Sequence, residues 1–125
     1  MSIRISERRD QDVTIVDLRG QLTLGESVAA FREFIEQKAR LIAPHLLINL
    51  GGLNYLDSAG LGELTAASHR ITACGGIIKL LNVNFRIGDL LSLTRLCTVF
   101  ETFDDEENAL ATFAGARVFT ETYYG

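Results

Sequence analysis

The chain has 125 residues, of which 47% are hydrophobic and 22% charged, and this composition predicts one globular domain with its own hydrophobic core. A formal net charge of −4 excludes the basic field that attracts nucleic acid or an anionic membrane, and no apolar run approaches the roughly 20 residues of a membrane-spanning helix. The two cysteines, Cys74 and Cys97, have no pairing pattern, so we expect a cytoplasmic protein with both thiols in its core. We also expect no cofactor, no metal and no insertion into membranes.

The chain begins with a predicted strand hairpin. Ile3 and Ile5 alternate with polar residues, and β-branched residues gather between Val13 and Leu18. The polar stretch 7–12 between them is interpreted as the connection.

A helix is predicted over about 24–42. Thr23 and Glu26 have the spacing of a capping box, and Pro44 is expected to end the helix. The apolar positions that share one helical face are Val28, Phe31, Ile35, Ala39 and Ile42.

A buried strand is predicted next. Residues 46–50 form a nearly unbroken apolar run, typical of a strand covered on both faces, so this is the expected central strand. Gly51 and Gly52 are interpreted as a turn after it. A second helix is predicted from Ser58 to about Ala73, with Leu61, Leu64, Ser68 and Ile71 facing inward and Gly75 and Gly76 ending it.

The last third predicts one strand and two helices. Ile77–Leu81 reads as a buried strand, and Asn84 can cap a helix whose Ile87, Leu90, Leu91 and Thr94 share a face. Asp104 and Glu107 form a second capping pair before Leu110, Phe113 and Ala114. Residues 117–125 fit a strand, a swapped arm or a loose tail.

Strands that alternate with helices predict crossover connections. We therefore expect a single α/β domain with a mixed, mostly parallel sheet, an antiparallel hairpin at its amino-terminal edge and about four helices outside. The domain spans 1–125, with a core over about 3–115 and a carboxy-terminal arm or extra strand over 116–125.

The region around Ser58 resembles two catalytic motifs only in part. A nucleophile elbow would have a glycine at Leu56 and a histidine near the serine, but His45 is expected at the opposite end of the central strand and His69 about 16 Å along the helix. The glycines at 60 and 62 match a dinucleotide fingerprint except that Thr65 replaces its third small residue. The sequence therefore predicts no enzyme.

Ser58 remains as a candidate in two ways. It can be a simple helix N-cap, or it can accept a phosphate beside the helix amides of Ala59, Gly60 and Leu61, which lack partners within the helix. Gly60 and Gly62 leave bare backbone there, so another protein can approach closely.

Three stretches carry a family resemblance. They are Val13–Gly20 with Leu22, the apolar run Leu46–Leu50, and Leu53-Asn54-Tyr55-Leu56-Asp57-Ser58-Ala59-Gly60-Leu61-Gly62. Over roughly residues 4–114 the chain resembles the STAS family, and within it the bacterial anti-sigma-factor antagonists, and it shares their element order.

The resemblance implies a phosphorylation switch. It implies that Ser58 is phosphorylated by an anti-sigma factor that is itself a serine kinase of the histidine-kinase-like ATPase fold. The unphosphorylated form would bind this kinase and release the sigma factor. The expected contact residues are Thr23, Asp57, Ser58, Ala59, Gly60, Leu61 and Gly62. Thr23 stands where members commonly carry an aspartate near the phosphorylation site.

Two alternatives stay open. The chain could instead be a structural STAS subunit of a lipid-transport or stress-signalling complex, in which Ser58 is never modified, and an esterase that uses Ser58 is disfavoured because its base is missing. Oligomeric state is open as well, with a homodimer as one assembly.

Overall fold

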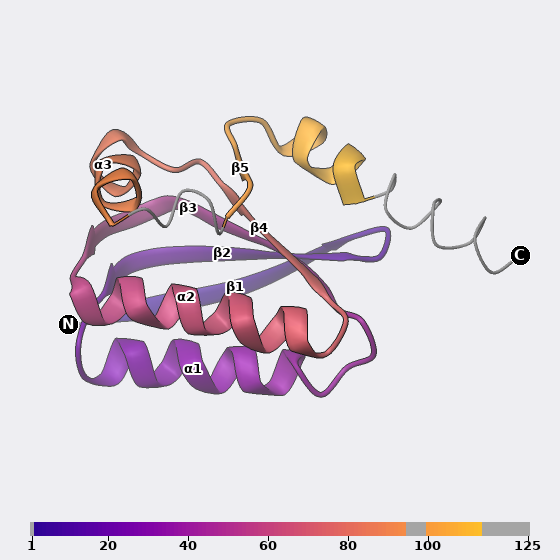
Figure 1. Ribbon diagram of the computed structural model, residues 1–125, viewed down its shortest axis with the longest axis horizontal. Coiled ribbons are helices and arrows are strands. Elements are labelled where there is room, and N and C mark those ends of the chain that lie inside the picture. Colours follow the sequence, from indigo (N-terminus) through magenta and orange to yellow (C-terminus); the bar gives the residue numbers. More distant parts are fainter. Residues whose placement is uncertain (1, 95–99, 114–125) are drawn as a thin grey trace, which may run out of the picture.

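Five strands form one sheet in the computed structural model, which describes residues 2–94 and 100–113 (Figure 1). They are β1 (Ile3–Asp10), β2 (Val13–Leu22), β3 (His45–Leu56), β4 (Ile77–Leu81) and β5 (Thr102–Phe103), and they lie side by side in this order. β1 pairs antiparallel with β2, and all other pairs are parallel. The mixed sheet with its amino-terminal hairpin is confirmed, and so is the central place of residues 46–50 in β3.

The described residues form four helices, which pack on both faces of the sheet. They are α1 (Glu26–Lys38), α2 (Ser58–Ala73), α3 (Phe85–Leu93) and a last helix over residues 106–113. α1 and α2 lie next to each other and bury their apolar faces against one side of the sheet, where Phe31, Leu64 and Ile71 are fully buried (Figure 1). On the other side, Ala109 and Phe113 of the last helix pack in a smaller core. No helix in the described parts of the chain is long and apolar enough to cross a membrane.

The inward faces of the helices agree with their predicted periodicity. Leu61, Leu64, Ser68 and Ile71 are all buried in α2, and Val28, Phe31 and Ile35 are buried in α1. Asn84 caps α3 as predicted, because its side chain accepts a hydrogen bond from Ile87 N–H at 2.9 Å. Gly75 follows α2 with φ of 81°, the left-handed conformation expected there.

The predicted ends of α1 are wrong at both sides. The helix begins after Gly25, no side chain caps it, and it ends at Lys38 instead of near residue 42. In place of the capping box, Ser27 Oγ accepts from Thr23 N–H at 2.8 Å and donates to Thr23 C=O at 2.9 Å. Ile42 fits the helical period but is 97% exposed, because the chain has already left the helix when it reaches this residue.

Gly51 and Gly52 do not form a turn, since both lie inside β3. Gly52 pairs with Arg19 of β2 beside a shift in strand register. A Cβ at Gly52 would lie 2.8 Å from the Arg19 side chain and 2.9 Å from the Leu18 carbonyl oxygen, so the absence of a side chain allows the two strands to approach.

Two features near the carboxy-terminal end differ from the prediction. The short strand β5 was not expected, and Asp105, not Asp104, caps the last helix by accepting from Asn108 N–H at 2.9 Å. Cys74 is half-buried rather than a core residue. Cys97, Ala114 and the arm over 116–125 lie outside the described residues.

Candidate functional site

The candidate site lies at the carboxyl end of β3, where the chain turns into α2. β3 ends at Leu56 and α2 begins at Ser58, so Asp57 alone forms the junction. Leu22, the last residue of β2, pairs with Leu56, and its carbonyl accepts from Asp57 N–H at 3.4 Å. The parallel pairing of β2 and β3 therefore brings Thr23, just after β2, to the same edge of the sheet as Ser58.

Asp57 is the N-cap of α2, so the interpretation of Ser58 as a simple N-cap is wrong. One carboxylate oxygen, Oδ1, accepts from Gly60 N–H at 2.8 Å, and the other, Oδ2, accepts from Leu24 N–H at 3.0 Å. The hydrogen bonds from Leu24, Gly60 and then Ala59 lower the pKa of Asp57 because they stabilise its charged form. One side chain thus caps the helix and anchors the loop that precedes α1.

Ser58 is exposed and occupies the first position of the helix. Its hydroxyl makes no hydrogen bond to the described part of the chain, because Asp57 already meets the need for a cap. The Ser58 oxygen is therefore available to a partner or to a modifying enzyme.

The helix amides are less available than the sequence suggested. Gly60 N–H is bound by the Asp57 carboxylate, and Leu61 N–H donates to the Asp57 carbonyl at 2.9 Å. The expectation that these amides lack partners within the helix is wrong for Leu61, which makes the first helical bond, whereas Gly60 N–H has only the side-chain cap. A phosphate on Ser58 can reach Gly60 N–H only by displacing Asp57.

The two glycines of the first turns differ in their surroundings. Gly60 is buried, and a Cβ there would run into the carbonyl oxygen of Leu22. Its missing side chain therefore allows α2 to pack on the end of β2, which corrects the interpretation that the bare backbone serves a partner. Gly62 is exposed, and a Cβ there would meet nothing within 4 Å. Leu61 is only 7% exposed and belongs to the core.

The exposed and half-buried residues of this edge form what we call the Ser58 surface, defined by Thr23, Leu24, Asp57, Ser58, Ala59 and Gly62. Sequence reasoning missed Leu24, which is 80% exposed while its backbone N–H is bound to Asp57. The signal was weak: Leu24 lies one residue after Thr23 and outside the set of positions that form the apolar face of α1. A large apolar side chain beside an exposed serine suits contact with another protein.

The described residues bring no general base to Ser58. His45 begins β3 at the opposite end of the strand and packs against Phe113 with ring centroids 5.6 Å apart, while His69 is about 16 Å further along α2. The neighbouring carboxylate of Asp57 has both oxygens bound by amides and a lowered pKa, so it is a poor base. Nor do the described residues contain a group of three metal ligands. The arrangement can offer a hydroxyl to another catalyst.

Comparison with known proteins assigns the chain to a family. The family model described as the STAS domain matches residues 4–109, and the chain belongs to that family. A protein from Paenibacillus polymyxa named anti-sigma F factor antagonist is 29% identical over 110 residues, which cover 88% of this chain and 94% of that protein.

Solved structures share the fold at lower sequence identity. An anti-sigma factor antagonist from Mycobacterium paratuberculosis superposes with a TM-score of 0.78 at 22% identity, covering 89% of this chain and 93% of that one. The Bacillus cell fate determinant SpoIIAA in its phosphorylated form superposes with a TM-score of 0.67 at 18% identity, covering 88% of this chain and 99% of that one.

Proposed function

We propose that the chain is an anti-sigma-factor antagonist that works by partner switching, with Ser58 as the phosphorylated residue. The observation that carries the proposal is that Asp57 and Ser58 have different roles at the start of α2. Asp57 caps the helix, so the exposed hydroxyl of Ser58 is left without a structural role. The name of the Paenibacillus polymyxa relative and the phosphorylated form of SpoIIAA support this choice.

The partner in this proposal is an anti-sigma factor of the histidine-kinase-like ATPase fold, which acts in the cytoplasm and is itself a serine kinase. It would bind the Ser58 surface, with Leu24 as the apolar contact and Gly62 as the point of closest backbone approach. Gly60 and Leu61 would hold α2 against the core of the domain, and Thr23 would lie at the edge of the Ser58 surface. Binding the unphosphorylated chain would occupy the anti-sigma factor and so free the sigma factor for transcription.

The chain acts as a substrate in the modification step. The Ser58 oxygen would accept the γ-phosphoryl group of ATP and lose its proton, while ADP leaves from the kinase. ATP, the magnesium ion and the catalytic groups belong to the kinase, and we propose no intrinsic enzymatic activity for this chain.

Phosphorylation would weaken the interface by placing charge where the partner packs. The phosphate adds a charge of about −1.5 to −2 next to the Asp57 carboxylate, whose pKa is lowered and which therefore stays ionised at neutral pH. Gly60 N–H in the first turn of α2 is already bound to Asp57, so it offers the phosphate little compensation within the chain. Burying this charge against the partner then favours dissociation.

Mass spectrometry after incubation with ATP and a kinase-like anti-sigma factor tests the modification. We expect one phosphate, on Ser58, and none on Ser58→Ala. Ser92, an exposed serine of α3, serves as an internal control and should stay unmodified. A chain that binds the partner without ever acquiring a phosphate would support the structural-subunit alternative instead.

A further inference from the structure

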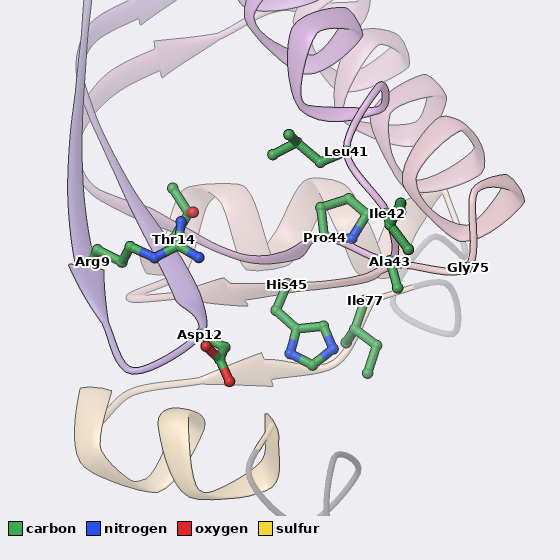
Figure 2. Close-up of a pocket in the computed structure, with 10 residues that line it drawn as sticks. All are labelled: Arg9, Asp12, Thr14, Leu41, Ile42, Ala43, Pro44, His45, Gly75 and Ile77. Atoms are coloured by element: carbon green, nitrogen blue, oxygen red, sulfur yellow. The ribbon is translucent and has the colours of Figure 1, made fainter. Parts of the chain in front are cut away.

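A hollow of about 650 Å³ opens at the edge of the sheet where the parallel strands begin, opposite to the edge that carries Ser58 (Figure 2). This volume falls within the roughly 300–1,000 Å³ of small-molecule sites. The walls come from the β1–β2 hairpin, the loop after α1 and the starts of β3 and β4. The lining residues used below are Arg9, Thr14, Leu41, Ile42, Pro44 and Ile77.

The hollow exists because α1 ends before it has covered the whole of β1. Ile5 packs against the core, and Glu7, two residues further on the same side of β1, accepts from Lys38 Nζ at 2.8 Å. Lys38 is the last residue of α1. Arg9 is the next residue on this side, it pairs with Thr14 across the hairpin, and it lies beyond the end of the helix.

Two polar groups that line the hollow have no hydrogen-bond or ion-pair partner among the described residues. Thr14 is only 6% exposed, yet its hydroxyl makes no hydrogen bond to the described part of the chain. The small surface that Thr14 keeps lies in the hollow, where Figure 2 shows it beside the Arg9 side chain. The guanidinium of Arg9 likewise forms no ion pair with a described residue. The Thr14 hydroxyl, which reaches the solvent of the hollow, and the adjacent Arg9 guanidinium favour an anion able to accept hydrogen bonds. Asp12 also lines the hollow, but this residue already has an interaction of its own.

The opposite wall is apolar and open to water. Leu41 is 50% exposed and Ile42 97% exposed, and Pro44 and Ile77 continue this wall toward the sheet. The carbonyl oxygens at the end of α1 accept hydrogen bonds from Arg40 and Leu41 N–H, which reduce the partial negative charge of the helix end. The helix end therefore does not neutralise the positive charge of Arg9. A ligand that complements both walls has an anionic head for the polar wall and a hydrocarbon tail for the apolar wall.

We propose that this hollow binds a small amphipathic carboxylate. The carboxylate pairs with the Arg9 guanidinium and accepts from the Thr14 hydroxyl, and the hydrocarbon tail covers Leu41, Pro44 and Ile77. The site goes beyond the proposed function and does not depend on it, because it lies at the opposite end of β3 and shares no residue with the Ser58 surface.

An amide NMR titration with sodium octanoate tests the site directly. In the wild-type protein we expect saturating shifts at Thr14, His45 and Ile77. The affinity of Arg9→Gln should be roughly tenfold lower, because a charge-assisted bidentate contact is lost. Thr14→Val, which keeps the shape of the side chain but removes its hydroxyl, should bind several-fold more weakly.

Arg4→Gln is the matched control. Arg4 lies on the same strand and is exposed, but it is on the other side of β1 and outside the hollow, so this variant should bind octanoate like the wild type. Octan-1-ol, which has the tail without the charge, should bind the wild type no better than octanoate binds Arg9→Gln. Shifts that do not saturate, shifts centred elsewhere, or equal affinities for the wild type and Arg9→Gln would overturn the proposal.

Discussion

The carboxylate of Asp57 joins two segments that are far apart in the chain, the loop before α1 and the first turn of α2. Each of its oxygens accepts one backbone N–H, from Leu24 and from Gly60. Aspartate is a strong N-cap, and here the same side chain also holds the loop that carries the exposed Leu24. The shape of the Ser58 surface therefore depends on a residue that need not touch the partner.

Stability should depend on pH through Asp57 in a defined direction. Its pKa is lower in the folded chain than the unfolded value of about 3.9, so the unfolded chain takes up the proton first as the pH falls. The contribution of Asp57 is complete above that unfolded value and is lost as the pH falls through the folded pKa. Thermal unfolding should show Asp57→Asn melting a few degrees below wild type at neutral pH, with the gap narrowing as the pH falls below the unfolded value of about 3.9. A gap that stays constant over this range would contradict the assignment.

Gly60 and Gly62 form a matched pair for separating packing from binding. Gly60→Ala should lower the free energy of unfolding by about 1–3 kcal/mol, because its Cβ would press on the Leu22 carbonyl. Gly62→Ala should raise it by about 0.5–1 kcal/mol, because alanine favours a helix and the site is open. Urea unfolding measures both. Equal effects of the two substitutions would argue against the close packing of α2 on β2.

At the scale of the elements, an ion-pair cluster joins the two helices beneath the Ser58 surface. Glu63 of α2 has a side chain only 7% exposed, and its carboxylate contacts Arg32 of α1 at 3.0 Å and Arg70 of α2 at 3.2 Å. The pairing with Arg32, then Arg70, lowers the pKa of Glu63 despite its burial. The cluster links α1 to the helix that presents Ser58.

Replacing Glu63 should loosen this link. Glu63→Gln should lower the free energy of unfolding by about 1–3 kcal/mol, because it removes charge-assisted hydrogen bonds at a buried position. Glu33→Gln, an exposed position of α1 with no ion pair in the described residues, is the control and should change it by less than about 0.5 kcal/mol. Denaturant unfolding of both variants checks this, and similar losses for the two would contradict a specific role for Glu63.

An element could be predicted well where its sequence signals are local, and poorly where contacts with other elements determine it. The bounds of α2 were predicted at both ends, since an aspartate before Ser58 and glycines after Cys74 are local signals. The end of α1 was not, because Ile42 continues the apolar period although the helix has already ended at Lys38. Gly51 and Gly52 resemble a turn locally, and only the pairing of β3 with β2 shows why a strand needs them.

The site itself followed the same rule. Ser58 and Asp57 were found from a short contiguous pattern, but the cap was assigned to Ser58, one residue too late, since either residue type can cap a helix. The second bond of Asp57, to Leu24, spans two distant segments and could not be predicted. The burial of Gly60 against Leu22 is likewise a contact between elements, and no spacing in the sequence predicts it.

At the scale of the whole molecule, the sheet separates two edges with different chemistry. One edge carries the Ser58 surface at the carboxyl ends of β2 and β3, and the other carries the hollow of Arg9 and Thr14 at the starts of β3 and β4. Between them lies a core whose largest side chains are fully buried, including Phe31 and Phe113. A change at Ser58 should therefore alter binding at its own edge while the fold stays intact.

Calorimetry that compares the wild type, Ser58→Ala and Ser58→Asp with a kinase-like anti-sigma factor tests the central claim most directly. Ser58→Ala should bind like the wild type, and Ser58→Asp should bind at least tenfold more weakly, about 1.4 kcal/mol, because its charge must be buried beside Asp57. The melting temperatures of the three proteins should agree within a few degrees, because Ser58 bonds to no described residue. Equal affinity of the wild type and Ser58→Asp for a partner that binds the Ser58 surface would contradict the switch.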